Sequence, residues 1–597
     1  MIIDQRLPTV LRVVLCTLVL LLLATSCSRS EMTDPETLEA SELAAIAGVV
    51  EASLGVSTST QPADAMLRLA DFQAYAALWS GGRSLARAWG GSLDEALEAA
   101  SSAVEDGPAQ VEFVEISLAH GFRTLDLESL GSDLTSIHRG VRGLQVAHGD
   151  RILRFAPSDM VASNLSFERA LSRAARTLEL DGQTLIQEAQ VATFEAAQVV
   201  VDTGEEPALA RQLLRGNRLV SMDQVSREGV ADLGLGMQHW MLNNLHRDGR
   251  MTYMYYPTSG KESDSNNMIR QWMASLCLTR MGLATGDASV LEAAQSNIRY
   301  NLAQFYRVEG ELGLIEYDGK VKLGAVALAA LAILEHPERE QFAEPLTRLI
   351  ATTDHLWRDD GAFQTFYRPA SRSADPNLHN FSPGETLLLW ASLLKEAPDA
   401  DRQRRFMQSF NYYRDWHLAN RKPSFIPWHT QAYYLEWQRT GDPRLRDWIF
   451  EMNDWLLDMQ VYSRQAYDDT EGRFYDPRPE NRHFGPPHAS STGVYLEGLI
   501  DAYQLAMAEG DDHRAAAYAR SMELGLRSAM QLQFRDDETG WFVRDRARTV
   551  GGLRTTVYNN VIRVDNVQHT LMAVMKIQDH LARAGESPLL SGDPAGR

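Results

Sequence analysis

The feature that most constrains the fold is a unit repeated along the second half of the chain, in which a short turn leads into an apolar helix. Six such turns occur: RDGRMTYMYYP, EGELGLIEYDG, DDGAFQTFYRP, RKPSFIPWH, TEGRFYDPRP and ETGWFVRDR. The segments that follow, such as KLGAVALAALAIL and SSTGVYLEGLIDAY, are apolar on every side. Most are succeeded by a more amphipathic helix. A period of about 50 residues with one such unit per repeat predicts a closed array or a solenoid.

Six helix pairs predict a mainly α fold, an α/α toroid in which amphipathic helices surround an inner ring of apolar ones. We expect this toroid over residues 230–585. Its inner helices should all begin at one end of the ring, where hydroxyls such as those of Ser490 and Ser491 can cap free amides. Polar side chains at these helix starts should therefore line a single pocket.

The region before the toroid, over residues 41–215, has the pattern of a small α+β domain. PAQVEFVEISLA alternates at period two, as a half-buried strand does, and GVRGLQVAHGDRILRFAP predicts two strands joined by a tight turn. This segment, followed by SNLSFERALSRAARTLEL, resembles the core of the AMMECR family, an α+β domain without a settled activity. The cysteine of that family has no counterpart in RSLARAWGG. The resemblance implies a structural or binding module.

The start of the chain has the pattern of an export signal. The apolar run VLRVVLCTLVLLLLATS is shorter than a typical membrane-spanning helix and ends at small residues before Cys27. LLLATSC resembles the bacterial lipoprotein signal, which implies a signal peptide at 1–26, lipidation of Cys27 and a tether at 27–40. The protein would then be lipid-anchored in the bacterial cell envelope, at the outer membrane. The alternative is an uncleaved membrane anchor.

Loops of the form TGD in YYLEWQRTGDPRL and MGLATGDASV give the toroid region a resemblance to two enzyme families. These are the uronyl epimerases, through their C-terminal domain, and the N-acylglucosamine epimerases. The resemblance implies a carbohydrate-active protein that binds a sugar or a uronate-containing glycan. It predicts the fold more closely than the reaction, because one toroid hosts many chemistries.

Candidate site residues follow from the helix starts and the turns before them. The candidates for catalysis are His429, His488, Glu385 and Asp565, and those for substrate binding are Arg270, Asn267, Tyr255, Trp428, Arg563, Tyr558 and His569. Flat aromatic rings beside polar groups suit a sugar, although such rings also serve to pack turns against helices. Arginines in a concave site suit a carboxylate, although they also form structural ion pairs.

Three functions remain open on these residues. His429 and His488 could exchange a proton at carbon, as in an epimerase, because imidazole titrates near neutrality. Glu385 and Asp565 could instead be the two carboxylates of a glycoside hydrolase. The toroid could also bind a glycan or a protein without catalysis. A histidine at a helix start is often only structural.

The composition and motifs of the chain exclude some classes of binding partner. The net charge of −21 argues against nucleic acid, since phosphate binding needs a basic face. No H-E-x-x-H or paired C-x-x-C motif occurs, so we expect neither a metal site nor a cofactor. The expected partners are a sugar substrate and, through the lipid anchor, a membrane.

Overall fold

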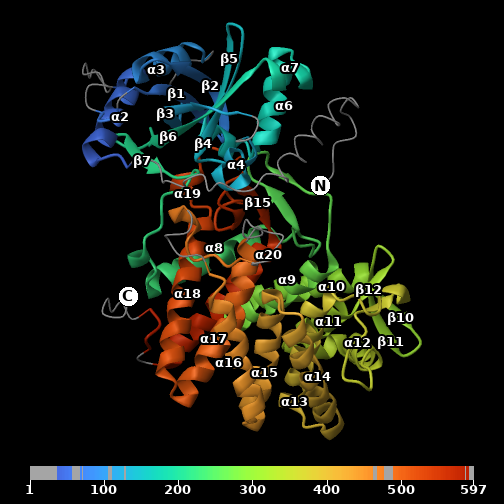
Figure 1. The fold of residues 1–597 in the computed structure, drawn as a ribbon. Helices are drawn as coiled ribbons and strands as arrows, with labels where there is room; N and C mark the ends of the chain where they lie inside the picture. The colour runs from blue at the N-terminus through green and yellow to red at the C-terminus, as the bar shows by residue number, and fades with distance from the viewer. Residues whose placement is uncertain are drawn as a thin grey trace.

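The computed structural model describes residues 37–56, 67–69, 71–104, 110–126, 130–460, 467–475, 488–584 and 587–590. The predicted signal peptide, Cys27 and most of the predicted tether lie outside these residues. In the part of the chain that is described, no helix is long and apolar enough to cross a membrane. Figure 1 shows a β-rich N-terminal part above a larger ring of helices.

The N-terminal part is built on an antiparallel seven-stranded sheet of order β2-β1-β3-β6-β4-β5, with β7 paired to β6. The strands are β1 (Gln73–Ser80), β2 (Arg83–Gly90), β3 (Phe113–Thr124), β4 (Arg142–His148), β5 (Arg151–Phe155), β6 (Gln190–Asp202) and β7 (Leu209–Leu213). The helices are α2 (Ala40–Ser53), α3 (Leu93–Ser102), α4 (Leu130–Asp133), α5 (Pro157–Ala162), α6 (Phe167–Leu178) and α7 (Gly182–Gln187). The predicted tight turn joins β4 to β5, where His148 pairs with Arg151.

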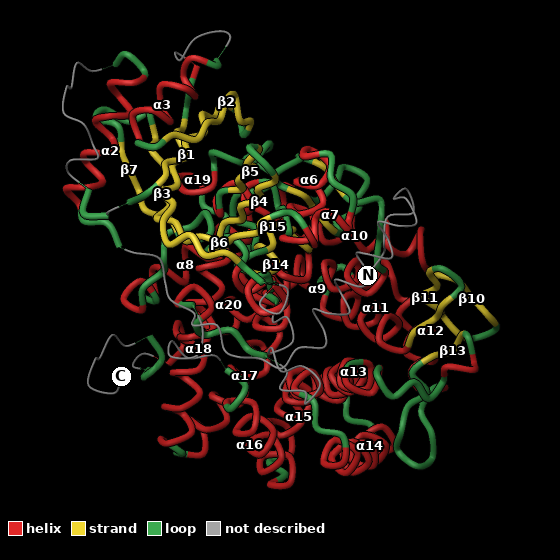
Figure 2. Tube along the Cα trace, turned by 45° about the horizontal axis from the view of Figure 1, so that its top comes forward, coloured by secondary structure: helices red, strands yellow, loops and turns green. Residues whose placement is uncertain are grey.

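Alternate residues of the central strands face different partners, because side chains of a strand point to opposite faces of its sheet. In β1, Ala76 and Leu78 pack in the cluster formed with α2 and α3, whereas Tyr75, Ala77 and Trp79 belong to the apolar core of the helical ring. The ring of Trp79 meets Trp541 edge-on at 5.0 Å between centroids. One face of the sheet is therefore packed directly against the toroid (Figure 2).

The rest of the described chain confirms the α/α toroid. The inner helices are α9 (Met268–Thr285), α11 (Leu323–Glu335), α13 (Ser382–Glu396), α15 (Ile426–Thr440), α17 (Ala489–Glu509) and α20 (Val564–Ala584). The outer helices are α8 (Arg227–Asn243), α10 (Ala288–Phe305), α12 (Ala343–His355), α14 (Ala400–Ala419), α16 (Pro443–Leu457) and α18 (Asp512–Leu532), and α19 (Asp536–Thr539) is a short extra turn. Each inner helix packs against the next, and α20 packs against both α17 and α9, which closes the ring.

Short strands occupy some of the turns between the helices, as predicted, but RKPSFIPWH forms a 3-10 turn and the start of α15, and ETGWFVRDR forms no strand. One sheet has the order β10-β11-β12-β13 and the other β14-β15-β8-β9. Their bounds are β8 (Met254–Tyr256), β9 (Lys261–Glu262), β10 (Tyr306–Glu309), β11 (Leu312–Tyr317), β12 (Lys320–Lys322), β13 (Phe366–Arg368), β14 (Arg554–Thr556) and β15 (Asn559–Arg563). Strands β12 and β15 lead directly into the inner helices α11 and α20.

Helix α17 shows why an inner helix needs small residues as well as apolar ones. A Cβ on Gly493 would stand 2.6 Å from Oγ1 of Thr570 on α20, and one on Gly498 would stand 2.8 Å from Cα of Pro427 on α15. The two glycines let α17 approach both neighbours closely. The capping prediction is wrong in detail, because the N-cap residue of α17 is His488 and it makes no side-chain cap bond. The hydroxyl of Ser490 bonds the imidazole instead.

Candidate functional site

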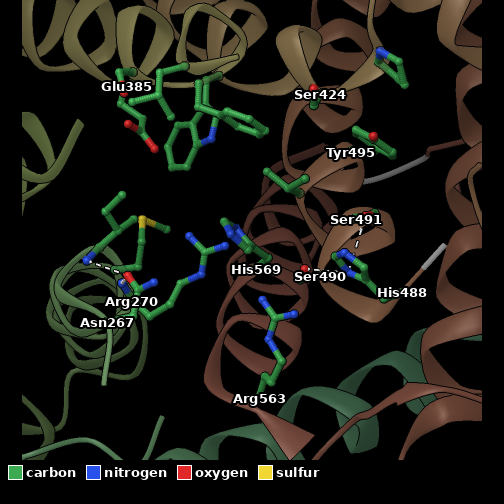
Figure 3. A pocket seen from close by; sticks show the side chains of 18 of the residues that line it. Asn267, Arg270, Glu385, Ser424, His488, Ser490, Ser491, Tyr495, Arg563 and His569 are labelled. Carbon is green, nitrogen blue, oxygen red and sulfur yellow. Dashed lines mark hydrogen bonds between the residues drawn. The ribbon is translucent and has the colours of Figure 1, made fainter. Parts of the chain in front are cut away.

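A cavity of about 550 Å³ opens where the inner helices begin. Of the predicted site residues, it is lined by Asn267, Arg270, Glu385, Trp428, His488, Arg563 and His569. Figure 3 shows Glu385, Arg270, His569 and His488 arranged around one open space. The volume lies in the range of small-molecule sites. The side chains come from several different inner helices, so the cavity depends on the ring being closed.

Glu385, in the first turn of α13, is a buried carboxyl group in the cavity wall. It is 4% exposed, and its Oε2 has no hydrogen-bonding partner among the described residues. Burial raises its pKa to about 7, against the opposing charges of Arg270 and Lys322. A carboxyl group with this pKa can give up or accept a proton at neutral pH.

Asp565 does not line the cavity, which corrects the expectation that it is an acid or base. It is fully buried and accepts hydrogen bonds from Nε of Arg270 at 2.9 Å and from Nε of Arg563 at 3.0 Å. Burial alone would raise its pKa, but the two guanidinium groups outweigh burial and hold the pKa at about 2. Asp565 is thus a permanently ionised anchor that holds both arginines at the cavity.

His569 is held by a carboxylate that sequence reasoning missed. Its Nδ1 lies 2.6 Å from Oε1 of Glu497, which is fully buried in α17. When Nδ1–H donates to this carboxylate, Nε2 is left as the free basic atom of the ring. A single glutamate within the apolar segment VYLEGLIDAY was the available signal, because a carboxylate is almost never buried without a partner.

His488 lines the cavity as predicted, from the position just before α17. Its Nδ1 shares a hydrogen bond of 2.8 Å with Oγ of Ser490. Burial lowers its pKa, Asp565 opposes this effect, and the nearby Arg563 and Arg270 add to it, so that the pKa is about 4. The imidazole is therefore neutral at pH 7 and suits hydrogen bonding to a sugar hydroxyl.

His429 lies outside the cavity, contrary to expectation. It is fully buried in α15 and stacks on Phe425 with 3.6 Å between ring centroids, with Tyr413 and Tyr433 nearby. Its Nδ1 bonds the carbonyl of Phe425 at 2.8 Å. Burial lowers its pKa to about 3. His429 is part of an aromatic core, so the predicted pairing of His429 with His488 is wrong.

Two predicted aromatic contacts also lie elsewhere. Tyr255 is fully buried in β8, with the guanidinium of Arg548 at 4.7 Å from its ring centroid. Tyr558 stands in the turn between β14 and β15 and packs against the ring core. The aromatic residues that line the cavity are Phe381, Trp428, Phe474, Tyr475 and Tyr495.

The cavity wall holds more basic than acidic residues, although the chain as a whole is acidic. Arg270, Lys322 and Arg563 line it. Burial lowers the pKa of Lys322, as do the nearby Lys320, Arg372 and Arg270. Glu385 is the one acidic residue among the described lining residues. This charge arrangement suits a ligand that carries negative charge or develops it during a reaction.

No protein-family model matches the chain, and no curated protein matches it. Solved structures do match. An alpha-1,6-mannanase from Salegentibacter sp. has 12% identity and a TM-score of 0.42, covering 58% of this chain and 98% of the mannanase. A D-mannose isomerase has 12% identity and a TM-score of 0.45, and the match covers 60% of this chain and 98% of the isomerase. A sugar epimerase from a ruminal bacterium has 11% identity and a TM-score of 0.43, and the match covers 59% of this chain and 97% of the epimerase. Similarity at this level does not assign a reaction to the chain.

Proposed function

We propose that the cavity binds an acidic sugar and transfers a proton at one of its carbon atoms, as a sugar epimerase does. The observation that supports this most directly is the unpartnered carboxyl group of Glu385 in the same cavity as the imidazole of His569. One group can take a proton while the other returns one. An inversion at carbon needs such a donor and acceptor.

The acid–base pair differs from the one that the helix starts suggested. Glu385 and His569 take the catalytic roles, with Glu497 as the residue that orients His569. The bond from the carbon to its proton breaks as a base takes the proton, and the electron pair moves toward an adjacent carbonyl or carboxylate oxygen. Arg270, Lys322 and Arg563 supply the positive charge that stabilises this oxygen.

A uronate is the sugar class that fits these cations. Guanidinium groups bind planar carboxylates well, and Asp565 fixes the orientation of two of them. Trp428 is an aromatic residue of the cavity wall that a sugar ring could contact. His488 and Asn267 complete the polar wall, although Oδ1 of Asn267 is already engaged in capping α9.

The hydrolase alternative requires two carboxylates across the scissile bond. Among the described residues of the cavity wall, Glu385 has no carboxylate partner, and Asp565 is bound to two arginines behind the wall. A binding protein without catalysis does not require an unpaired buried carboxyl group, which is costly to maintain. Both observations favour proton transfer.

Incorporation of solvent deuterium tests the proposal directly. The protein is incubated in D₂O with free uronates and with uronate-terminated oligosaccharides, and the sugars are examined by NMR. Deuterium should appear on carbon, together with an epimer or isomer, and both should disappear in Glu385→Gln. Cleavage of a glycosidic bond without deuterium on carbon would contradict the proposal and favour the hydrolase.

The site is proposed to act in the bacterial cell envelope, on a protein anchored by lipid to the outer membrane. The chain is proposed to consist of an AMMECR-like domain over 41–215 and the toroid over 230–585. Support for the anchor comes from the apolar run that ends at Cys27. A Cys27→Ser variant should leave the membrane fraction and lose labelling by a fatty-acid probe. Unchanged labelling would remove the anchor from the proposal.

A further inference from the structure

The hairpin of β14 and β15 connects the N-terminal sheet to the cavity wall. β15 ends at Arg563, which lines the cavity, and α20 begins at the next residue and carries His569. Within the toroid, β15 pairs with β14 and, at two positions, with β8. The four strands of this sheet are all short, so contacts outside the sheet can help to set the position of the hairpin.

The N-terminal part supplies these contacts to β15 through Asn560. This residue is 2% exposed, and its Nδ2 donates to the carbonyl of Val161 in α5 at 2.6 Å. Its backbone N–H donates to Oδ1 of Asn164 at 3.2 Å, and Nδ2 of Asn164 donates to Oδ1 of Asn559 at 3.3 Å. Asn164 has a φ of 48°, a left-handed conformation that asparagine adopts more readily than most residues.

The other strand of the hairpin is held in the same way. Arg554 in β14 is 1% exposed, and its Nη1 donates to the carbonyl of Arg215 at 2.9 Å. Its Nη2 donates to Oδ1 of Asn217 at 2.9 Å. Arg215 and Asn217 follow the last strand of the N-terminal sheet. Both strands of the hairpin are thus bonded to residues that precede the toroid.

We propose that Asn560 is a positioning residue of the cavity, which ties β15 to α5 and so sets where Arg563 and the start of α20 stand. The N-terminal part then completes the sugar site as well as packing against the ring. The inference depends on the proposed function in one respect only, which is the identity of the ligand that binds to Arg563. The position of the hairpin can be measured without any ligand.

Two variants of the full-length protein remove the connection by different routes. Asn560→Ala deletes the donor to Val161. Asn164→Gly deletes the bonds to residues 559 and 560, and glycine tolerates the left-handed φ of that position. Trp79→Phe is the control, because Trp79 meets Trp541 at the same junction and its indole N–H makes no hydrogen bond among the described residues. The control distinguishes a general loosening of the junction from an effect on the hairpin.

Amide hydrogen exchange of the segment 553–570 decides the proposal. Asn560→Ala and Asn164→Gly should both speed exchange in this segment. Trp79→Phe should not, even if it lowers Tm by as much as the two asparagine substitutions do. Unchanged exchange in the two asparagine variants would overturn the proposal. Faster exchange in all three variants would overturn it as well, because the effect would then belong to the junction in general.

Binding of D-glucuronate, measured by calorimetry, shows whether Asn560 acts through Arg563. Asn560→Ala should weaken binding about fivefold in the wild-type background and cause no further loss in an Arg563→Gln background. If Asn560→Ala weakens binding equally in both backgrounds, Asn560 does not act through Arg563. If the wild type binds no uronate, the uronate proposal fails, and the hydrogen-exchange result still decides the role of Asn560.

Discussion

Oε2 of Glu385 lies 1.9 Å from the point where a Cβ on Gly324 would stand. Oγ of Ser382 lies 2.8 Å from the same point. Helix α11 can pass the cavity carboxyl at this distance only because residue 324 has no side chain. The glycine therefore determines where the carboxyl group of Glu385 can be.

Substitution of Gly324 should inactivate the site without unfolding the ring. In Gly324→Ala the new methyl group must push the carboxyl of Glu385 aside, and a misplacement of about 1 Å can cost about 100-fold in rate. Turnover of the sugar identified by deuterium exchange measures this loss. Gly48→Ala in α2 is the matched control, because no atom lies within 4 Å of its Cβ position. Equal activity of the two variants would contradict the role given to Gly324.

Removal of either acid–base group should cost turnover far more than affinity. Glu385→Gln and His569→Gln should each lower kcat by about 100- to 10,000-fold, because each keeps a hydrogen-bonding side chain but cannot exchange the proton. Steady-state kinetics and calorimetric binding separate the two effects. Asp454→Asn, which breaks a surface pair with Arg514, is the control and should leave kcat unchanged. A parallel loss of affinity and rate would indicate substrate positioning instead.

The orienting residue should have a smaller effect than the group it orients. Glu497→Gln still offers an oxygen to Nδ1 of His569, but a neutral amide is a weaker acceptor than a carboxylate and holds the ring less firmly. We expect a loss of kcat that is smaller than that of His569→Gln, measured by steady-state kinetics. An unchanged kcat would mean that Glu497 does not orient His569.

The buried carboxyl of Glu385 should make stability fall as pH rises. Its pKa is about 7 in the folded protein and about 4.3 in an unfolded chain, so between these values the folded state holds a proton that the unfolded state has lost. Raising the pH through this window therefore lowers the free energy of unfolding. Glu385→Gln should remove this dependence and gain up to about 4 kcal/mol over the wild type at pH 8. Thermal unfolding from pH 5 to 8 measures it, and parallel curves for the two proteins would count against the raised pKa.

His429 should matter for packing but not for catalysis. His429→Phe keeps the stack on Phe425 and loses one hydrogen bond, which is worth about 1 kcal/mol. We expect a slightly lower Tm and an unchanged kcat. A loss of turnover as large as that of His569→Gln would show that His429 reaches the substrate after all.

The sequence predicted the ring because the alternation of turns and apolar helices repeats regularly. It also predicted which end of the ring is polar, because all inner helices begin there. It did not predict which side of each helix faces the axis. Helices that are apolar on every side have no periodic stripe to mark their orientation. His429 and His569 both lie near helix starts, and only packing determines that the first points into an aromatic core and the second into the cavity.

The closure of the ring by α20 has a consequence for the order in which the protein forms. Strand β15 and helix α20 are the last elements of the described chain, yet they carry Arg563, Asp565 and His569. Helix α20 packs against α9, which is made some 300 residues earlier. Contacts this distant in sequence form slowly and only after loop closure. During synthesis, α9 and α17 are made before α20, so the surfaces that α20 covers in the folded protein stay exposed until α20 is made. Such exposed surfaces are prone to misassembly. A nascent chain released before α20 emerges would hold most of the fold and several residues of the cavity wall, including Glu385, but it would lack His569 and the helix that closes the ring.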